Sequence, residues 1–425
     1  MNRIKLIVFS SSLHDEASVM GSRRQLLDGI RKFAELELVF PSDLDQNDME
    51  KEISNDGTTE EVVSFIATGG TEEMFRLYAD TLPKPVTLLC DGVHNSFAAT
   101  MEISSFLAGK GIENRVFSAP LDYNEAFFAG FERELFSEGG SQRSCEEAHE
   151  LVYNEETLQS ISGHTIGLFG ESSPWLISSG IDRGKVSDRF GVKFIDIPLE
   201  ELEKEYDLTR ASNSEVAGTV ERMEQFLSGD RKRIDLENAA RMYVAMKTIC
   251  SRYSLTALTI KCFGILDSCR TTACLALALL NDEGILCACE GDIPALWTMI
   301  YAKNVYGGVS FMANPASADR AELTVDFAHC TIPLSMVNGY RLPSHFESSI
   351  GIGIAGIVPC GKYRLIKITG SSLERIYYAE GEILMNTNIP QRCRTQLRFR
   401  FSNAEDFDRF LVTSKGNHII ISSIL

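Results

Sequence analysis

Two acidic residues follow an apolar stretch in the run Gly284-Ile-Leu-Cys-Ala-Cys-Glu-Gly-Asp-Ile-Pro. Asp292 stands two residues before Pro294, a spacing typical of a helix N-cap, which is a structural role. Glu290 stands at the end of a predicted buried parallel strand, where open α/β sheets bind their ligands. Its carboxylate is therefore predicted to face a crevice. The alternative is an ion pair with a buried base such as Lys261 on the neighbouring predicted strand.

Two of the seven histidines stand beside predicted strands of the C-terminal region. His329 follows the alternating run 325–328, and His418 precedes the apolar run that starts at Ile419. A single histidine at a strand edge is more often a hydrogen-bonded packing residue than a ligand. One carboxylate with two imidazoles, however, is a donor set that suits Mn, Fe or Zn. Glu290, His329 and His418 are therefore the predicted metal ligands.

Polar residues also follow the other predicted strands, and they could bind hydroxyl groups of a small ligand. An aromatic ring could stack on a sugar ring, although such residues fit many sugars. Gly69-Gly70 could cradle a phosphate, but without a GxGxxG or Gly-Lys-Ser/Thr motif a tight turn is the favoured interpretation, and no nucleotide is predicted. The residues predicted to contact the ligand are Ser11, His94, Ser172, Trp175 and Lys261.

The elements that must position these residues alternate between strands and helices, which is typical of βαβ units around parallel sheets. After Pro315 the polar and apolar residues alternate at period two, which indicates antiparallel strands. The prediction is an α/β chain with two Rossmann-like doubly wound domains, residues 1–158 and 159–315, and a C-terminal antiparallel β-rich domain, residues 316–425. Predicted strands include 4–9, 62–67, 86–90, 192–196, 256–262, 284–289 and 308–313; predicted helices include 22–35, 95–109, 270–280 and 293–304, with an exposed bend over 138–143.

Composition limits the classes of partner. The formal net charge of −18 repels nucleic acid and anionic lipid surfaces. No apolar stretch approaches the roughly 20 residues that span a bilayer, and the apolar run at the N-terminus is too short for a signal peptide. Eleven cysteines without a CxxC pair are predicted to be reduced and mostly buried. A cytoplasmic protein with no nucleic-acid or membrane partner is predicted.

Several segments together resemble the L-fucose isomerase-like proteins of the L-fucose and L-arabinose isomerase superfamily. They are Gly167-Leu-Phe-Gly-Glu-Ser-Ser-Pro-Trp, Ile260-Lys-Cys-Phe, Ala273 to Ile285, Ala288-Cys-Glu-Gly-Asp-Ile-Pro, Phe311-Met-Ala-Asn-Pro, His329-Cys and Gly416-Asn-His. The resemblance implies a homo-trimer or homo-hexamer that isomerises a monosaccharide between aldose and ketose through an enediol. It also implies a divalent cation, typically Mn²⁺, with Glu290 and His418 matching metal ligands and His329 matching the additional histidine of the arabinose-type enzymes.

The chain departs from this pattern at two places. Asn314 stands where the isomerases have a second acid that binds metal and moves the proton, and an amide cannot act as a general base. The chain also ends soon after His418, where the resemblance would continue, so the C-terminal domain is predicted to be truncated. Glu290 and Asn314 are the predicted catalytic positions. Metal binding with weak or absent isomerisation is expected, and a catalytically silent sugar-binding or regulatory relative is the alternative.

Overall fold

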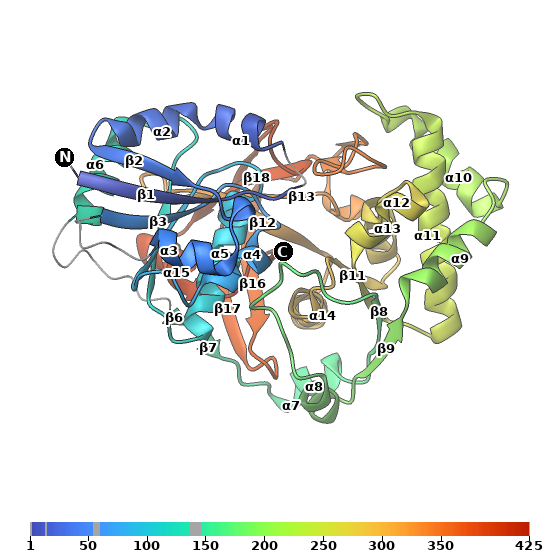
Figure 1. The fold of residues 1–425 in the computed structure, drawn as a ribbon. Helices are drawn as coiled ribbons and strands as arrows, with labels where there is room; N and C mark the ends of the chain where they lie inside the picture. Colours follow the sequence, from blue (N-terminus) through green and yellow to red (C-terminus); the bar gives the residue numbers. More distant parts are fainter. Residues whose placement is uncertain (1, 13–14, 54–59, 137–145, 425) are drawn as a thin grey trace.

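The computed structural model describes residues 2–12, 15–53, 60–136 and 146–424. It contains two parallel sheets and one closed antiparallel sheet, with the closed sheet between the other two (Figure 1). The bend predicted over 138–143 lies outside the described residues. No helix in the described part of the chain is long and apolar enough to cross a membrane.

The first parallel sheet has the strand order β2-β1-β3-β4-β5. Strand β4 is buried along its whole length, and β1 is buried from Leu6 to Phe9, because helices cover both faces of the sheet, with a separate hydrophobic cluster on each face. The strands are β1 (Asn2–Phe9), β2 (Ala34–Val39), β3 (Glu60–Ile66), β4 (Val86–Cys90) and β5 (Asn114–Ser118); the helices are α1 (Glu16–Ser22), α2 (Arg24–Arg31), α3 (Gln46–Ile53), α4 (Glu72–Tyr78), α5 (Ser96–Gly109) and α6 (Glu125–Phe136).

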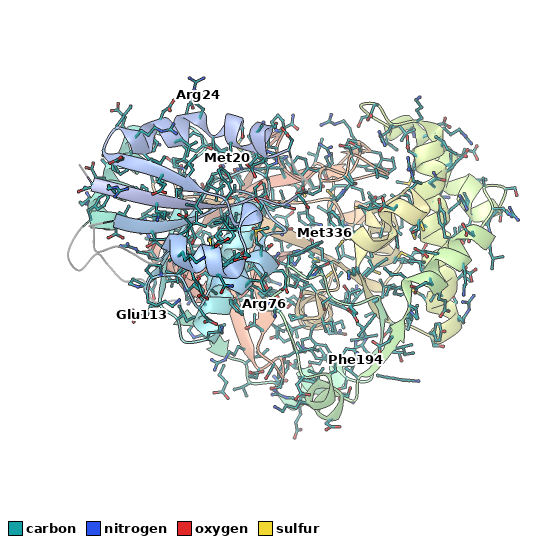
Figure 2. The ribbon with its side chains drawn as sticks, viewed as in Figure 1. Met20, Arg24, Arg76, Glu113, Phe194 and Met336 are labelled. Atoms are coloured by element: carbon teal, nitrogen blue, oxygen red, sulfur yellow. The ribbon has the colours of Figure 1, made fainter. Side chains whose placement is uncertain are left out.

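Helix α2 is amphipathic as predicted, with Leu26, Leu27 and Ile30 buried and Arg24 pointing away from the molecule (Figure 2). The predicted helix over 22–35 is nevertheless too long, because α2 ends at Arg31 and β2 begins at Ala34. Residues 34–39 alternate between apolar and acidic side chains, and this period-two pattern pairs with β1 instead of continuing the helix.

The second parallel sheet has the order β11-β10-β8-β9 and carries the Glu290 segment at one edge. Its strands are β8 (Thr165–Phe169), β9 (Lys193–Ile197), β10 (Ala257–Ile260) and β11 (Leu286–Cys289). The helices of this region are α7 (Glu155–Ile161), α8 (Arg183–Phe190), α9 (Leu199–Leu208), α10 (Ser214–Met223), α11 (Arg233–Tyr253), α12 (Leu266–Cys269), α13 (Cys274–Asp282) and α14 (Ile293–Tyr306).

The third sheet is antiparallel, with the order β16-β20-β12-β13-β18-β17-β7, and a further pairing of β16 with β17 closes it. Its main strands are β12 (Ser310–Asp319), β13 (Thr324–His329), β16 (Gly361–Thr369), β17 (Arg375–Asn386), β18 (Thr395–Phe401) and β20 (Ile419–Ser423); β7 is His149–Glu150 and α15 is Ala404–Val412. Two further small sheets pair β14 (Tyr340–Arg341) with β15 (Ala355–Gly356) and β19 (Thr413–Ser414) with β6 (Glu146–Glu147). The period-two runs after Pro315 do pair antiparallel, as predicted.

The prediction that residues 308–313 form a strand of the second parallel sheet is wrong. This segment is the start of β12, which pairs antiparallel with β13 and β20. A short apolar run has the same pattern in either kind of sheet, so only its distant partners decide the direction. Side chains of the second parallel sheet and the closed sheet pack into one continuous core. The ten described cysteines are unpaired, and all except Cys360 are buried, as the composition predicted.

A buried ion pair joins the closed sheet to the first parallel sheet. Asp326 on β13 accepts hydrogen bonds from Arg392 and Arg398 at 2.7 Å each, and Arg392 also donates to the carbonyl oxygen of Gly92 at 2.6 Å. The side chains of Asp326 and Arg392 are both 2% exposed. Burial raises the pKa of Asp326, but the hydrogen bonds and charges of Arg398 and Arg392 outweigh it, so the net shift is downward.

Asp326→Asn is expected to lower the free energy of unfolding at pH 7 by about 2 kcal/mol, because it leaves a buried guanidinium without its counter-charge. Because the pKa of Asp326 is lowered in the folded state, the ion pair stabilises the protein fully above the unfolded pKa of about 3.9. This stabilisation is lost as the pH falls through the pKa of the folded state. Urea titrations at pH 7 and pH 3 measure it. Glu382→Gln, which breaks an exposed pair with Arg400, is the control and should cost under about 1 kcal/mol; equal losses for the two variants would contradict the assignment.

Candidate functional site

Glu290, His329 and His418 form the one group of described residues whose donor atoms lie close enough together to hold a metal ion, all within 4.8 Å of one another. The Oε1 atom of Glu290 is 3.6 Å from Nε2 of His418 and 3.9 Å from Nε2 of His329. Glu290 follows β11 of the second parallel sheet, whereas the histidines come from the ends of β13 and β20. The site therefore lies where the two sheets meet.

The turn after β11 holds Glu290 in an unusual backbone conformation. Glu290 has φ +64° and Gly291 has φ +72°, and the left-handed conformation costs a residue with a side chain about 1–2 kcal/mol. A Cβ on Gly291 would lie 2.5 Å from the Cα of Ser172, so only glycine fits there. The Glu290 carbonyl accepts a hydrogen bond from the Ser173 N–H, and Trp175 Nε1 donates to Glu290 Oε2 at 2.5 Å. The fold thus holds one carboxylate oxygen and leaves the other facing the histidines.

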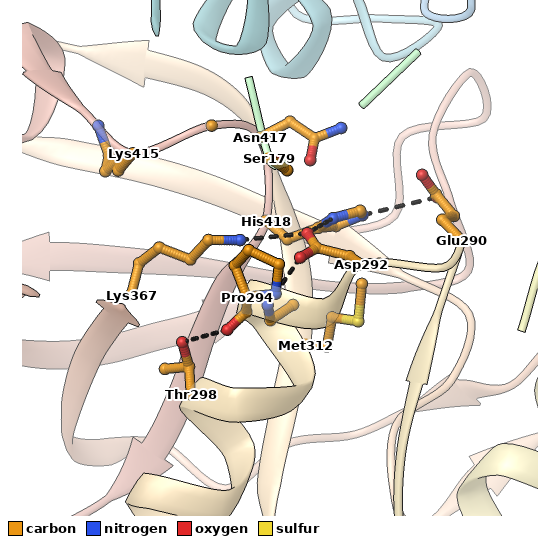
Figure 3. Close-up of polar contacts among 12 residues, drawn as sticks. Ser179, Glu290, Asp292, Pro294, Thr298, Met312, Lys367, Lys415, Asn417 and His418 are labelled. Carbon is orange, nitrogen blue, oxygen red and sulfur yellow. Dashed lines mark hydrogen bonds and ion pairs between the residues drawn. The ribbon is translucent and has the colours of Figure 1, made fainter. Parts of the chain in front are cut away.

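A buried carboxylate orients His418. Nδ1 of His418 lies 2.8 Å from Oδ2 of Asp292, and the same oxygen accepts from Lys367 Nζ at 3.1 Å. Figure 3 shows this series from Lys367 through Asp292 and His418 to Glu290. The other histidine nitrogen, Nε2, is buried without a hydrogen-bond partner among the described residues. A histidine held by a carboxylate at one nitrogen and free at the other is the usual arrangement of a metal ligand.

His329 is held in the same manner, with Nδ1 2.9 Å from Oγ1 of Thr331. Asp292 also caps α14, where it accepts from the Ala295 N–H at 2.7 Å. Its prediction as an N-cap is confirmed, but the sequence did not predict its contact with His418. One carboxylate and two oriented imidazoles fit Mn²⁺, Fe²⁺ or Zn²⁺. A divalent cation there would polarise an oxygen of a bound ligand as a Lewis acid.

The charges of the site support one another. Burial raises the pKa of Glu290, but the charge of His418 and the contacts of both histidines with the carboxylate outweigh the effect of burial and bring the pKa well below its ordinary value. Burial likewise opposes ionisation of Asp292, but Lys367 and His418 lower its pKa to about 2. Burial lowers the pKa of His418, whereas Glu290 and Asp292 together raise it to about 9. Without a metal the site is therefore held together by ion pairs that a divalent cation would replace.

Asp292→Asn is expected to weaken Mn²⁺ binding about 10- to 100-fold, because it removes the negative charge that orients His418 and makes it more basic. Asparagine caps a helix as well as aspartate does, so α14 should persist. Calorimetric titration with Mn²⁺ measures the affinity, and circular dichroism checks the helix content. An unchanged affinity in a folded variant would show that His418 is not a ligand.

The cluster opens into a cavity of about 60 Å³, which is enough room for a few water molecules. All three sheets or the loops after them contribute to its wall. Asn95 Nδ2 donates to Glu347 Oε1 at 2.6 Å across the wall, and the Asn417 amide oxygen is buried without a hydrogen-bond partner among the described residues. The polar residues of the wall, besides Glu290 and His329, are Glu72, Asn95, Asn314, His345, Glu347 and Asn417; the thiols are Cys262, Cys274, Cys289, Cys330 and Cys393.

The structure brings some of the predicted ligand-contacting residues to this cavity and not others. Trp175 and Asn314 line it. Ser11, His94, Ser172 and Lys261 are not among the residues that line it; Ser172 instead donates to the carbonyl oxygen of Gly291 at 2.8 Å. The alternative of a Glu290–Lys261 pair is not seen, since the ion partners of Glu290 in the described chain are the two histidines.

The sequence missed the residues that the first parallel sheet contributes. Glu72 and Asn95 each stand one position beyond a polar loop that follows a predicted strand. Because ligands of open α/β sheets bind beyond the strand ends, a search one residue further along each loop would have included them. Glu102 on α5 accepts from the Asn417 N–H at 3.0 Å and from the Ser178 N–H at 2.7 Å. This buried carboxyl braces the turn that carries His418, and no sequence pattern indicates it.

No family model matches the sequence. The chain is similar to sulfoquinovose isomerases. It is 27% identical to that of Alkalicoccus urumqiensis over 176 residues, 41% of this chain and 37% of the relative. It is 28% identical to that of Clostridium sp. (strain MSTE9) over 214 residues, 44% of this chain and 46% of the relative. A third, from Priestia aryabhattai, is 23% identical over 176 residues. The chain thus spans less than half the length of each of these relatives.

Proposed function

We propose that this protein is a metal-dependent aldose–ketose isomerase of a small monosaccharide, related to the L-fucose and L-arabinose isomerases. The observation that carries the proposal is the cluster of Glu290, His329 and His418, in which each histidine is oriented at one nitrogen and directs the other toward the carboxylate. The similarity to sulfoquinovose isomerases supports isomerisation of a sugar.

The role of the metal follows from the chemistry of the reaction. A divalent cation, for which Mn²⁺ is the first choice, would polarise the sugar carbonyl so that the neighbouring C–H becomes acidic. Trp175 and the amides of Asn314 and Asn417 line the cavity and would contact the sugar. Pockets that hold small molecules are typically about 300–1,000 Å³, so a sugar would have to displace the loop that carries Glu347. The 2.6 Å bond from Asn95 to Glu347 is the contact that would open.

The organisation of the chain belongs to the same proposal. Two Rossmann-like domains, residues 1–158 and 159–315, and a β-rich domain, residues 316–425, would assemble as a cytoplasmic homo-trimer or homo-hexamer. Light scattering should then give a mass well above that of the 47.2 kDa subunit.

The activity is tested with protein stripped of metal by EDTA and reloaded with Mn²⁺. The reloaded protein is incubated with L-fucose, L-arabinose and sulfoquinovose, and ketose formation is followed. Ketose that appears with Mn²⁺ and disappears with EDTA is expected. Sugar binding without any ketose would favour the catalytically silent relative, for which the amide at position 314 is the supporting observation. Absence of both metal and sugar binding would contradict the whole proposal.

A further inference from the structure

The proposed isomerisation needs a group that takes a proton from one carbon and returns it to the next. Asn314 cannot do so, because an amide is not a base at neutral pH. Glu290 is a proposed ligand of the metal, so its carboxylate is already committed to the cation. The following inference rests on the proposed function and concerns the residue that moves the proton.

A second carboxyl group, that of Glu72, lines the same cavity as Glu290 and Asn314. Glu72 is the first residue of α4, which follows β3 of the first parallel sheet through the loop 67–71. It is 2% exposed, and its Oε2 atom has no hydrogen-bond partner among the described residues. A buried polar atom without a partner is costly, typically about 1–3 kcal/mol, so its persistence calls for an explanation such as a ligand.

Two other ionisable groups of the cavity wall have hydrogen-bond partners. Glu347 accepts a hydrogen bond from Asn95 at 2.6 Å, and His345 Nδ1 lies 3.0 Å from the Ser348 hydroxyl. Among the lining carboxyl groups of the described chain, Glu72 is the one with a buried oxygen that has no hydrogen-bond partner.

The environment of Glu72 also suits proton transfer. Burial raises the pKa of Glu72, and the negative charges of Glu102 and Glu290 raise it further. Hydrogen bonds from the backbone N–H groups of Glu72 and Thr71 oppose the shift, and the pKa is about 8. A group that titrates near neutral pH can both accept and return a proton, which is the property a general base needs.

We infer that Glu72 is the catalytic base of the isomerisation, in the role that Asn314 cannot fill. Its carboxylate takes the proton from C2 of the aldose, and the C2–H electron pair becomes the C1=C2 bond of an enediolate while the C1 carbonyl oxygen gains the proton of the C2 hydroxyl and the negative charge rests on O2. The C1=C2 pair then takes the proton from Glu72 to form the second C–H bond at C1, while an electron pair of the O2 oxyanion forms the C2=O bond of the ketose. Glu72 ends as the carboxylate from which it started.

The test compares Glu72→Gln with the wild type and with Glu73→Gln, all loaded with Mn²⁺. Glu73 is the next residue of α4, but its side chain is 44% exposed and pairs with Arg76, so it is a matched control. With whichever of L-fucose, L-arabinose or sulfoquinovose the wild type converts, Glu72→Gln is expected to lower kcat about 100- to 10,000-fold. The Mn²⁺ affinity, measured by calorimetry, should stay within about threefold, and Glu73→Gln should match the wild type. If the glutamine variant does not fold, Glu72→Asp replaces it, because aspartate keeps the carboxyl group on a shorter side chain. A decrease in kcat of about tenfold or more is then expected.

The outcomes are separable. A wild type that converts one of these sugars, with a Glu72→Gln kcat within threefold of it, would overturn the assignment of Glu72 and leave the proposed function standing. A kcat loss that Glu73→Gln shares equally would also overturn it. A wild type that converts none of the three sugars would overturn the proposed function, and the role of Glu72 with it.

Discussion

Glu290→Gln is expected to weaken Mn²⁺ binding by about 1,000-fold or more, which is about 4 kcal/mol and the size of one charge interaction at 4 Å in a partly screened site. Glu290 is the one carboxylate of the cluster, so the variant leaves two neutral imidazoles and an amide to hold a divalent cation. Trp175 can still donate to the new amide oxygen, so the local turn should persist. Titration calorimetry, or the rise of melting temperature with added Mn²⁺, measures the loss.

Glu171→Gln provides the control for this change. Glu171 lies on the loop after β8, and its backbone carbonyl is adjacent to Gly291, but its side chain is exposed and does not line the cavity. The Glu171→Gln variant removes one negative charge near the site without removing a ligand. The Mn²⁺ affinity should therefore change by less than about threefold. A Glu290→Gln protein that retains Mn²⁺ would show that the ion binds elsewhere.

Asn314→Asp is expected to have the opposite effect and to tighten Mn²⁺ binding by about 100-fold, or about 2.7 kcal/mol. Asn314 on β12 is 5% exposed and lines the cavity beside the cluster, so the new carboxylate would add a second negative charge where a cation binds. Without metal, the same charge is buried near Glu290 and should lower the melting temperature. The two effects have different signs, and thermal unfolding with EDTA and with Mn²⁺ separates them.

Asn154→Asp is a suitable control for the second variant. Asn154 is exposed and caps α7 by accepting from the Thr157 N–H at 2.8 Å, a role that aspartate fills equally well. It changes the net charge by the same amount away from the cavity, so Mn²⁺ affinity should not change. If Asn314→Asp binds Mn²⁺ no more tightly than this control, then the side chain at position 314 does not reach the cation.

Local pattern was sufficient to predict many elements of the parallel sheets. Strand β4 begins and ends at the predicted residues, and α5 begins one residue after the predicted start. These segments are apolar runs bounded by polar turns, and their burial on both faces leaves a clear pattern. The pattern could not decide the partner of β12, because a buried strand has the same appearance in a parallel and an antiparallel sheet. It also could not place the end of α2, where helix and strand patterns overlap.

The residue types alone determined which chemistry the site could do. One carboxylate at a strand end and two histidines beside strands are few enough to single out, and the amide at position 314 is visible without a structure. The tertiary structure decided which groups meet. Glu72 is 218 positions away from Glu290 in the chain, and Lys367 and Asp292 are 75 positions apart. These residues come together because three separate sheets pack around one cavity, and long-range packing of this kind leaves no periodic signal in the sequence. Whether a carboxyl group is a strong or a weak base depends on that packing, since burial and neighbouring charges set its pKa.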